Sequence, residues 1–255
     1  MIIVIIALFF LLLVGLVVIF KNVLVNRDTL WNFKHCNVIV AGKKGTGKDL
    51  LFQWVINKRK DFYYANIPYG HKHKVICIKD VSCMPNTYYN LIQNKVEKQP
   101  HLFKEKKDIY ISDIGNFLPS YMDSLLYKYF PSMPLFYSLS RHLYNSNVHC
   151  NCQNIERGWK ALREQADFYI QVKRTYRIFC LFITKYYSYD RYESAKKNLL
   201  PIKTRLLNKF SKAEADKYRA ENGEIKKGFI FQWKWRLHYD TRAFEKIMLK
   251  GRRKK

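Results

Sequence analysis

The chain has 255 residues, which is enough for one sizeable domain and an appendage. Lys and Arg number 46 against 20 acidic residues, so the net charge is +26, and 48% of the residues are hydrophobic. The apolar content excludes a disordered chain. The charge is far larger than solubility requires and indicates polyanionic surroundings, either nucleic acid or anionic lipid.

The N-terminal segment predicts a membrane anchor. Residues 2–20 carry no charge, and at about 1.5 Å per residue a helix of this length spans about 28 Å, close to one hydrocarbon core. We expect a transmembrane helix over 1–21 and a basic linker over 22–35. Because basic residues follow the span and none precedes it, the N-terminus should lie outside and the body in the cytoplasm. A cleaved signal peptide lacks its basic start and cleavage site here; a buried soluble helix is the alternative.

A glycine-rich loop follows. The stretch "NVIVAGKKGTGKDLL" reads as a buried strand over 37–41, a loop over 42–47 and a helix over 48–58. Glycines let backbone N–H groups converge on a phosphate at the positive end of a helix, and a lysine adds a full charge there. A glycine turn without a ligand is the alternative. The residues expected to bind ATP are Gly42, Lys43, Lys44, Gly45, Thr46, Gly47, Lys48 and Asp49.

Two carboxylates are candidate Mg²⁺ ligands. Asp49 stands where a Ser or Thr usually holds the ion, and a carboxylate can ligate Mg²⁺ directly or through water. Asp113 follows the apolar residues 109–112, a pattern that resembles a Walker B strand. The water-activating Glu that usually comes next is replaced by Ile114, and Asn116 and Asp123 are the nearby substitutes.

The remaining pattern alternates strands and helices. It predicts an α/β fold of the P-loop NTPase class, with a mostly parallel sheet flanked by helices, over 36–190. The further expected strands run through "DFYYANIPYG" to residues 66–68 and over 73–78, 148–152, 167–174 and 175–187. The further expected helices cover 87–98, 134–144 and 156–166.

Two polar residues in this region are candidates for catalysis. Gln153 ends the strand 148–152, where P-loop motors often place a side chain that senses the γ-phosphate. Arg141, near the end of the preceding helix, could reach a neighbouring subunit's nucleotide or could be an ordinary surface residue. The pattern His149-Cys150-x-Cys152 is better explained by alternation along a strand than by half of a zinc site.

Residues 191–255 form a basic, aromatic C-terminal extension. From residue 195 onward 19 Lys or Arg stand against 6 Asp or Glu, which is half of the net charge of +26. Phe229, Phe231, Trp233 and Trp235 alternate with other residues, as on a strand. The extension either binds single-stranded DNA through stacking and phosphate contacts, or covers the core as an edge strand with its basic end near lipid headgroups.

The ordered set of motifs resembles the zonular occludens toxin-like (Zot-like) P-loop ATPases. The matching pieces, within residues 36–190, are "GKKGTGK", "YYANIP", "IYISDIGNFLP", "SLSRHLYNSNVHCNCQ" and "DFYIQVKRTY". The resemblance implies an ATPase of the host inner membrane that drives assembly and extrusion of filamentous single-stranded-DNA phage. It implies ATP and Mg²⁺ as cofactors, a homo-oligomeric ring, and DNA, coat proteins or an outer-envelope export protein as partners.

The same resemblance assigns roles to residues. Lys48 and Asp113 would bind nucleotide and metal, Gln153 would sense the γ-phosphate, and Arg141 would be a candidate arginine finger. The chain departs from the family at Asp49, at Ile114 and in the position of its membrane span, which lies before the domain. A DNA-packaging motor of the FtsK/HerA kind and a non-hydrolysing, membrane-tethered nucleic-acid-binding scaffold remain the alternatives.

Overall fold

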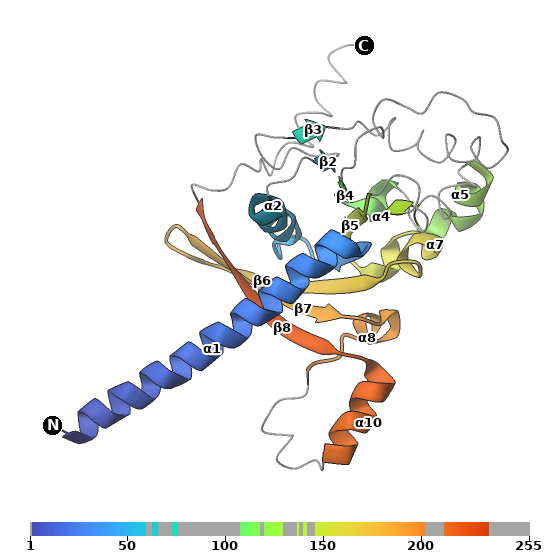
Figure 1. The fold of residues 1–255 in the computed structure, drawn as a ribbon. Helices are drawn as coiled ribbons and strands as arrows, with labels where there is room; N and C mark the ends of the chain where they lie inside the picture. The colour runs from blue at the N-terminus through green and yellow to red at the C-terminus, as the bar shows by residue number, and fades with distance from the viewer. Residues whose placement is uncertain are drawn as a thin grey trace.

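The computed structural model describes residues 2–59, 63–65, 73–75, 108–117, 120–129, 137, 140–141, 146–201 and 212–234. Eight strands form one sheet in the order β3-β2-β4-β5-β1-β6-β7-β8. The first six strands in this order are mutually parallel. At one edge β7 pairs antiparallel with β6, and β8 pairs antiparallel with β7 (Figure 1). The strands are β1 Val38–Ala41, β2 Tyr63–Ala65, β3 His73–Val75, β4 Asp108–Ile111, β5 Val148–Cys152, β6 Phe168–Ile178, β7 Leu181–Tyr189 and β8 Ile225–Trp233.

Helices flank the sheet. The two longest described helices are α1 and α2, and the others are shorter. The helical elements are α1 Ile2–His35, α2 Lys48–Arg59, α4 Ile114–Phe117, η2 Ser120–Met122, α5 Asp123–Tyr129, η3 Ile155–Arg157, α7 Lys160–Arg163, α8 Tyr192–Lys196 and α10 Lys212–Asn222. The predicted mixed α/β fold with a mostly parallel sheet is confirmed.

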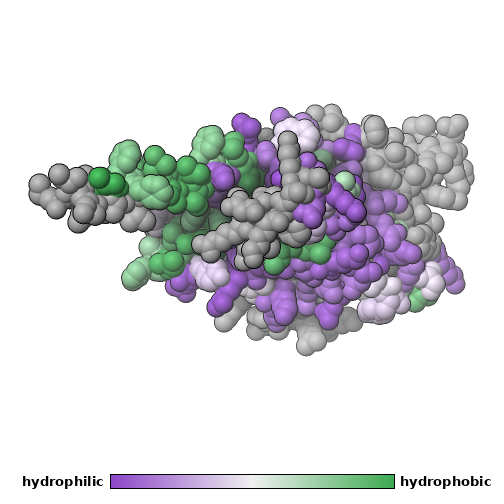
Figure 2. All heavy atoms as spheres, turned by 90° about the horizontal axis from the view of Figure 1, so that it is seen from below, coloured by the Kyte–Doolittle hydropathy of each residue, from purple (hydrophilic) through white to green (hydrophobic). Residues whose placement is uncertain are grey.

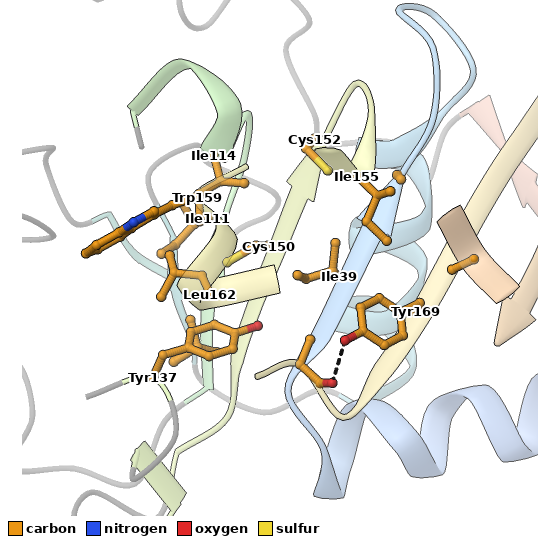
Figure 3. Packing of buried hydrophobic residues seen from close by; sticks show 14 of the residues in the cluster. Ile39, Ile111, Ile114, Tyr137, Cys150, Cys152, Ile155, Trp159, Leu162 and Tyr169 are labelled. Atoms are coloured by element: carbon orange, nitrogen blue, oxygen red, sulfur yellow. Dashed lines mark hydrogen bonds between the residues drawn. The ribbon is translucent and has the colours of Figure 1, made fainter. Parts of the chain in front are cut away.

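Two apolar layers cover the two faces of the sheet, because successive residues of a strand point to opposite faces. On one face, Val38 and Val40 of β1 pack with Leu51, Phe52 and Val55 of α2. On the other, Ile39 packs with apolar residues of β4, β5 and α7. Figure 3 shows Cys150 and Cys152 on β5 directed into this second layer, among Ile39, Ile111 and Ile155.

The helix α1 continues without a break through the predicted linker 22–35 and joins the sheet. The Asn22 side chain completes the edge of β8, because its amide bonds both the N–H (2.8 Å) and the C=O (2.9 Å) of Phe229. Asn26 donates a second bond to the same carbonyl (3.0 Å). Farther along, the Thr29 hydroxyl bonds the buried Tyr186 hydroxyl (2.9 Å). The second half of α1 is therefore part of the folded domain.

The end of α1 is capped by side chains from three distant segments. The last carbonyls of a helix have no partner within the helix. Here Arg59 donates to Phe33 O (2.8 Å), Asn147 to Lys34 O (2.9 Å) and Arg141 to His35 O (2.5 Å). These contacts fix α1 against the edge of the sheet at which the parallel strands begin.

The first half of α1 extends beyond the sheet (Figure 1). Large apolar side chains are exposed along it. Along residues 2–24 of α1, the exposed set comprises Ile6, Phe9, Phe10, Leu12, Leu13, Val14, Leu16, Val17, Val18, Ile19, Phe20, Val23 and Leu24. Within the described part of the chain, no helix combines the length and the apolarity that crossing a membrane requires.

Two predicted boundaries differ from the structure. The helix expected over 156–166 is interrupted, because Gly158 (ψ 153°) and Trp159 (ψ 129°) adopt extended backbone, which brings the Trp159 ring into the core. The strand break expected after residue 174 is absent. Instead β6 continues to Ile178, and the turn lies at residues 179–180.

Within the C-terminal extension, the described strand β8 joins the sheet, since it pairs with β7 throughout its length. The alternation seen from Phe229 to Trp233 therefore belongs to a strand of the sheet, as one of the two sequence-based interpretations expected. Trp235, the helix expected over 87–98 and the strand ends expected at 66–68 and 76–78 lie outside the described residues.

Candidate functional site

The glycine-rich loop leaves the carboxyl end of β1 and enters α2 at Lys48. It is tied to the neighbouring strand by a bond from Gly42 N to Cys152 O (3.1 Å). Gly45 (φ 78°) and Gly47 (φ 96°) occupy the left-handed region that favours glycine. A Cβ at Gly47 would lie 2.1 Å from Thr175 Oγ1, so a side chain there would collide with β6.

The loop is also closed by its own polar groups. Lys43 O accepts bonds from Thr46 N (3.2 Å), Thr46 Oγ1 (2.8 Å) and Lys48 Nζ (3.4 Å). Lys48 is 7% exposed, so its ammonium is held at the loop rather than in solvent. Thr175 Oγ1 donates to Thr46 O (2.7 Å) from the opposite side. The structure thus forms a small concave turn of backbone at the start of a helix.

The unusual Asp49 is held by two side chains from neighbouring strands. Its Oδ1 accepts bonds from Ser112 Oγ (2.8 Å) and from Asn151 Nδ2 (2.8 Å). Ser112 directly follows β4, where the Walker B carboxylate is expected. Position 49 therefore carries a carboxylate instead of the usual hydroxyl, and Ser112 at the end of β4 places a hydroxyl beside it.

Asp113 lies beside Asp49 with a strained backbone. Its φ of 54° is uncommon for a residue other than glycine, and its N–H is fixed by Asn151 Oδ1 (2.8 Å). Burial raises the pKa of the Asp113 carboxyl and the charge of Asp49 raises it further, whereas Lys48 and Lys44 lower it. Four of the predicted charged residues, Lys44, Lys48, Asp49 and Asp113, therefore lie close together at the carboxyl ends of β1 and β4.

The residues fit ATP and Mg²⁺. The loop presents backbone amides and a buried ammonium at a helix start, which is the donor set for phosphate. The charge of Asp49 disfavours ionisation of Asp113, and a divalent cation between the two side chains would relieve that repulsion. Among the described residues no group of three His, Cys, Asp or Glu surrounds a common point; Mg²⁺ commonly takes one or two carboxylates and completes its shell with phosphate and water.

Gln153 follows β5 at the same edge of the sheet as the loop. Its Oε1 accepts a bond from Arg157 Nη1 (3.1 Å), so Arg157 is a cation near this end that the sequence analysis did not single out.

Arg141 lies at the opposite edge of the sheet. Its guanidinium bonds His35 O and pairs with Asp167 (3.6 Å), which precedes β6. Within one chain it therefore does not belong to the loop site, and its role as a finger toward another subunit stays a prediction.

No carboxylate follows Asp113 in sequence. Ile114 is buried in the core, and Asp123 accepts a hydrogen bond from the Trp159 indole. The Asn116 side chain lies outside the described residues. Asp123 is thus committed to a structural contact, which argues against its use as the substitute base.

Asn151 is the site residue that the sequence analysis missed. It is fully buried on β5 and bonds Asp49, Ser112 and the Asp113 N–H together. The available signal was a lone amide inside an apolar strand, one position before the strand's carboxyl end. In the sequence the alternation of Cys150 and Cys152 around Asn151 is the more conspicuous feature. Burial raises the pKa of the Cys152 thiol to about 12 and raises that of Cys150 further, so both are apolar core residues.

A second buried charge cluster lies at the edge where the strands begin. Asp108 contacts Arg59 and His149 and accepts the Asn147 N–H (2.9 Å). Burial opposes ionisation of Asp108, but the contacts with His149, Arg59 and Asn147 outweigh it and lower its pKa to about 2. Burial lowers the pKa of His149. This cluster joins β4, α2 and α1 and does not adjoin the loop.

No protein-family model and no curated protein sequence matches the chain. Among solved structures, the N-terminal domain of zonular occludens toxin from Neisseria meningitidis is similar, with a TM-score of 0.46 and 9% identity over 82% of this chain and 97% of that one. The genome-packaging NTPase B204 from Sulfolobus turreted icosahedral virus 2 is similar in its complex with ATP-gammaS, with a TM-score of 0.39 and 13% identity over 62% of this chain and 92% of that one. The complex of the same NTPase with AMP is similar with a TM-score of 0.41 and 14% identity over 76% of this chain and 97% of that one. These similarities are distant.

Proposed function

We propose that the chain is a P-loop ATPase whose site is the loop 42–48 together with Asp49, Asp113 and Asn151. The observation that carries the proposal is the convergence of four features at one edge of the sheet. These are the glycine loop with positive φ, the buried Lys48, the paired carboxylates and the amide that fixes them. A ligand-free glycine turn does not require a buried lysine beside two carboxylates.

We infer a separate task for each of these residues. Backbone N–H groups of the loop would bind phosphate oxygens, and Lys48 Nζ, which contacts Lys43 O here, would bind the terminal phosphates. Bound Mg²⁺ would neutralise phosphate charge. Asp49 and Asp113 would hold it, while Asn151 keeps both carboxylates in place. Gln153, at the end of β5, is positioned to orient the attacking water or to sense the γ-phosphate.

Hydrolysis tests the proposal directly. The full chain in detergent, with Mg-ATP and with or without single-stranded DNA, should release phosphate above the rate of the Lys48→Ala variant. The loss in that variant should reach about a hundredfold, because an ammonium held at the terminal phosphates is removed. Equal rates for the two proteins, both well folded and oligomeric, would overturn the assignment.

We further propose that the ATPase works at the host inner membrane in the assembly and extrusion of filamentous phage, as a homo-oligomeric ring. What supports attachment is the uncharged stretch 2–20 and the apolar side chains exposed along α1. What supports a phage role is the ordered resemblance to the Zot-like ATPases. DNA or coat protein would be the transported material, with an export protein of the outer envelope as a further partner.

A non-hydrolysing, nucleotide-binding scaffold is the second candidate. The observation that favours it is the buried Ile114 at the position of the usual catalytic Glu. Tight Mg-ATP binding without turnover, in the presence of DNA and coat protein, would select this function. A DNA-packaging motor of the FtsK/HerA kind would instead show translocation of DNA without any requirement for coat protein.

A further inference from the structure

The hairpin β6–β7 and the end of β8 form an exposed apolar face with a basic surround. The register places Ile183 between Tyr176 and Phe231, and Leu181 between Ile178 and Trp233. Because paired residues point to the same side, these six side chains share one face. Tyr176, Ile178, Phe231 and Trp233 are all exposed on it, and Phe179, in the turn of the hairpin, is 90% exposed. We call these seven residues the hairpin face.

The charges around the hairpin face are all positive. Residues 168–189 contain four basic residues and residues 225–234 contain three, and neither range contains an acidic one. Arg174 lies over the Tyr176 ring (5.1 Å), Arg177 over Phe182 (5.9 Å) and Lys227 over Phe229 (4.9 Å). The cations thus lie along aromatic rings, as side chains do when their stems are apolar and their heads face anionic groups.

The hairpin face points to the same end of the molecule as the exposed half of α1. Asp28 pairs with Lys226 (2.9 Å), and Asn22 bonds Phe229, so α1 advances toward its N-terminus as β8 advances toward Trp233. Figure 1 shows the hairpin turn and the N-terminal half of α1 on one side of the fold. In Figure 2 hydrophobic side chains gather mainly at this end, and most of the other coloured residues on the face it displays are hydrophilic.

We propose that the hairpin face is a second membrane contact, which inserts into the interface of an anionic lipid bilayer beside α1. This inference rests on the membrane attachment contained in the proposed function. Trp, Tyr and Phe favour the headgroup level, and Lys and Arg gain about 1 kcal/mol each near an anionic surface. The aliphatic Ile178, Leu181 and Ile183 favour lipid over single-stranded nucleic acid, because they offer no ring on which a base can stack.

The contact would bring the nucleotide loop close to the membrane surface. Thr175 precedes Tyr176 and donates its hydroxyl to Thr46 O (2.7 Å) within the loop. Insertion of the hairpin would therefore fix the strand on which the loop rests. The ATPase domain would be held by two elements, α1 and the hairpin, and could not swivel freely about a single anchor.

Photo-crosslinking to lipid tests the contact. The full chain is placed in nanodiscs of phosphatidylcholine and phosphatidylglycerol that contain a lipid with a diazirine near its headgroup. After illumination and trypsin digestion, label is expected on the peptide 178–185 as well as on the peptide 1–21. The double variant Ile178→Ser with Phe179→Ser should lose about tenfold of the label on 178–185, because it removes two apolar side chains from the interface. The matched control Tyr121→Ser changes an aromatic residue that is 86% exposed outside the hairpin face and should leave the label unchanged.

The outcomes separate this inference from the proposed function. Label on 1–21 but none on 178–185, or equal label in the double variant, would overturn the second contact and leave the anchor. No label on either peptide would overturn membrane attachment as well, while ATP hydrolysis above that of Lys48→Ala would still stand. Label on 178–185 from a photoreactive oligothymidylate, and not from the lipid, would assign the hairpin face to single-stranded nucleic acid instead.

Discussion

At the scale of single residues, one buried amide holds the site together. Asn151 donates to Asp49 and accepts the Asp113 N–H, so it fixes one carboxylate of the loop and one that follows β4. It is a positioning residue, because it would act on a bound nucleotide only through Asp49 and Asp113. Partners of this kind typically change metal affinity by about 10–100-fold when they are removed.

We expect Asn151→Leu to weaken Mg-ATP binding by at least about tenfold, because Asp49 loses a donor and Asp113 loses the bond that holds its strained backbone. Isothermal calorimetry on the full chain in detergent measures this affinity with and without Mg²⁺. Asn154→Ala, three residues along the chain and exposed, is the matched control and should bind normally. An unchanged affinity in Asn151→Leu would show that the carboxylates do not depend on the amide.

The ion cluster at Asp108 gives the protein a defined response to acid. The pKa of Asp108 is about 2 in the fold against an ordinary value of 3.8. Because the folded value is the lower one, its stabilisation is complete above about pH 4 and is lost as the pH falls toward 2. The difference amounts to about 2 kcal/mol of unfolding free energy.

Denaturant unfolding between pH 5 and pH 2 tests this response. The wild-type chain should lose stability over the range below about pH 4, and Asp108→Asn should show a flatter dependence there. His149, whose pKa burial lowers, contributes an earlier loss that begins as the pH falls below its ordinary value of 6.5. Identical slopes for the wild type and Asp108→Asn would contradict the assigned pKa.

At the scale of elements, the hairpin β6–β7 supports the nucleotide loop. Thr175 donates to Thr46 O, so it accepts the hydroxyl of Thr184 on the paired strand (2.8 Å). Gly47 lies so close to Thr175 that any side chain at this glycine would displace the threonine. The loop therefore takes its shape from a strand that lies far from it in sequence.

Replacing Thr175 by Val should raise the KM for ATP about fivefold with little change in kcat, because the loop loses one hydrogen bond worth about 1 kcal/mol while its charges remain. Steady-state kinetics on the full chain measures both constants. Thr184→Val is the control, since it removes only the bond between the two threonines and leaves the one to Thr46. Equal effects of the two variants would show that Thr175 acts through the hairpin and not through the loop.

At the scale of the whole molecule, the two ends of the parallel strands carry different groups of residues. The carboxyl ends of β1, β4 and β5 carry the proposed nucleotide site, whereas the starts of these strands receive the end of α1 through Arg59, Asn147 and Arg141. This arrangement follows from parallel strands, which bring all carboxyl ends to one side.

Because Arg141 caps the last carbonyl of α1, we expect Arg141→Ala to lower the unfolding free energy by about 1 kcal/mol and to change kcat by less than about threefold. Its exposed pair with Asp167 adds little. Thermal unfolding and ATPase assays of the oligomer measure the two effects. A large loss of kcat that is restored by mixing with Lys48→Ala subunits would instead establish Arg141 as a finger acting on a neighbouring subunit.

The sequence by itself determined the elements whose signals are local. A strand, a glycine loop and a helix with one apolar face were readable because backbone propensity and periodicity act over a few residues. The positions of Lys48 and Asp113 followed from the same local patterns. The continuous uncharged stretch 2–20 was equally visible.

Only the tertiary structure decided which distant residues meet. Asn151 joins Asp49 and Asp113 because β5 lies beside both β1 and β4, and no pattern within β5 specifies that order. Arg141 caps α1 at the opposite edge of the sheet because a parallel sheet separates strand starts from strand ends. Residues 225–233 of the C-terminal extension join the sheet as β8. The unpaired backbone groups along the edge of β7 can be hydrogen-bonded by any segment that returns to them, so the choice of this segment depends on the whole chain. Long-range pairing and desolvation set these contacts, and they depend on the whole chain.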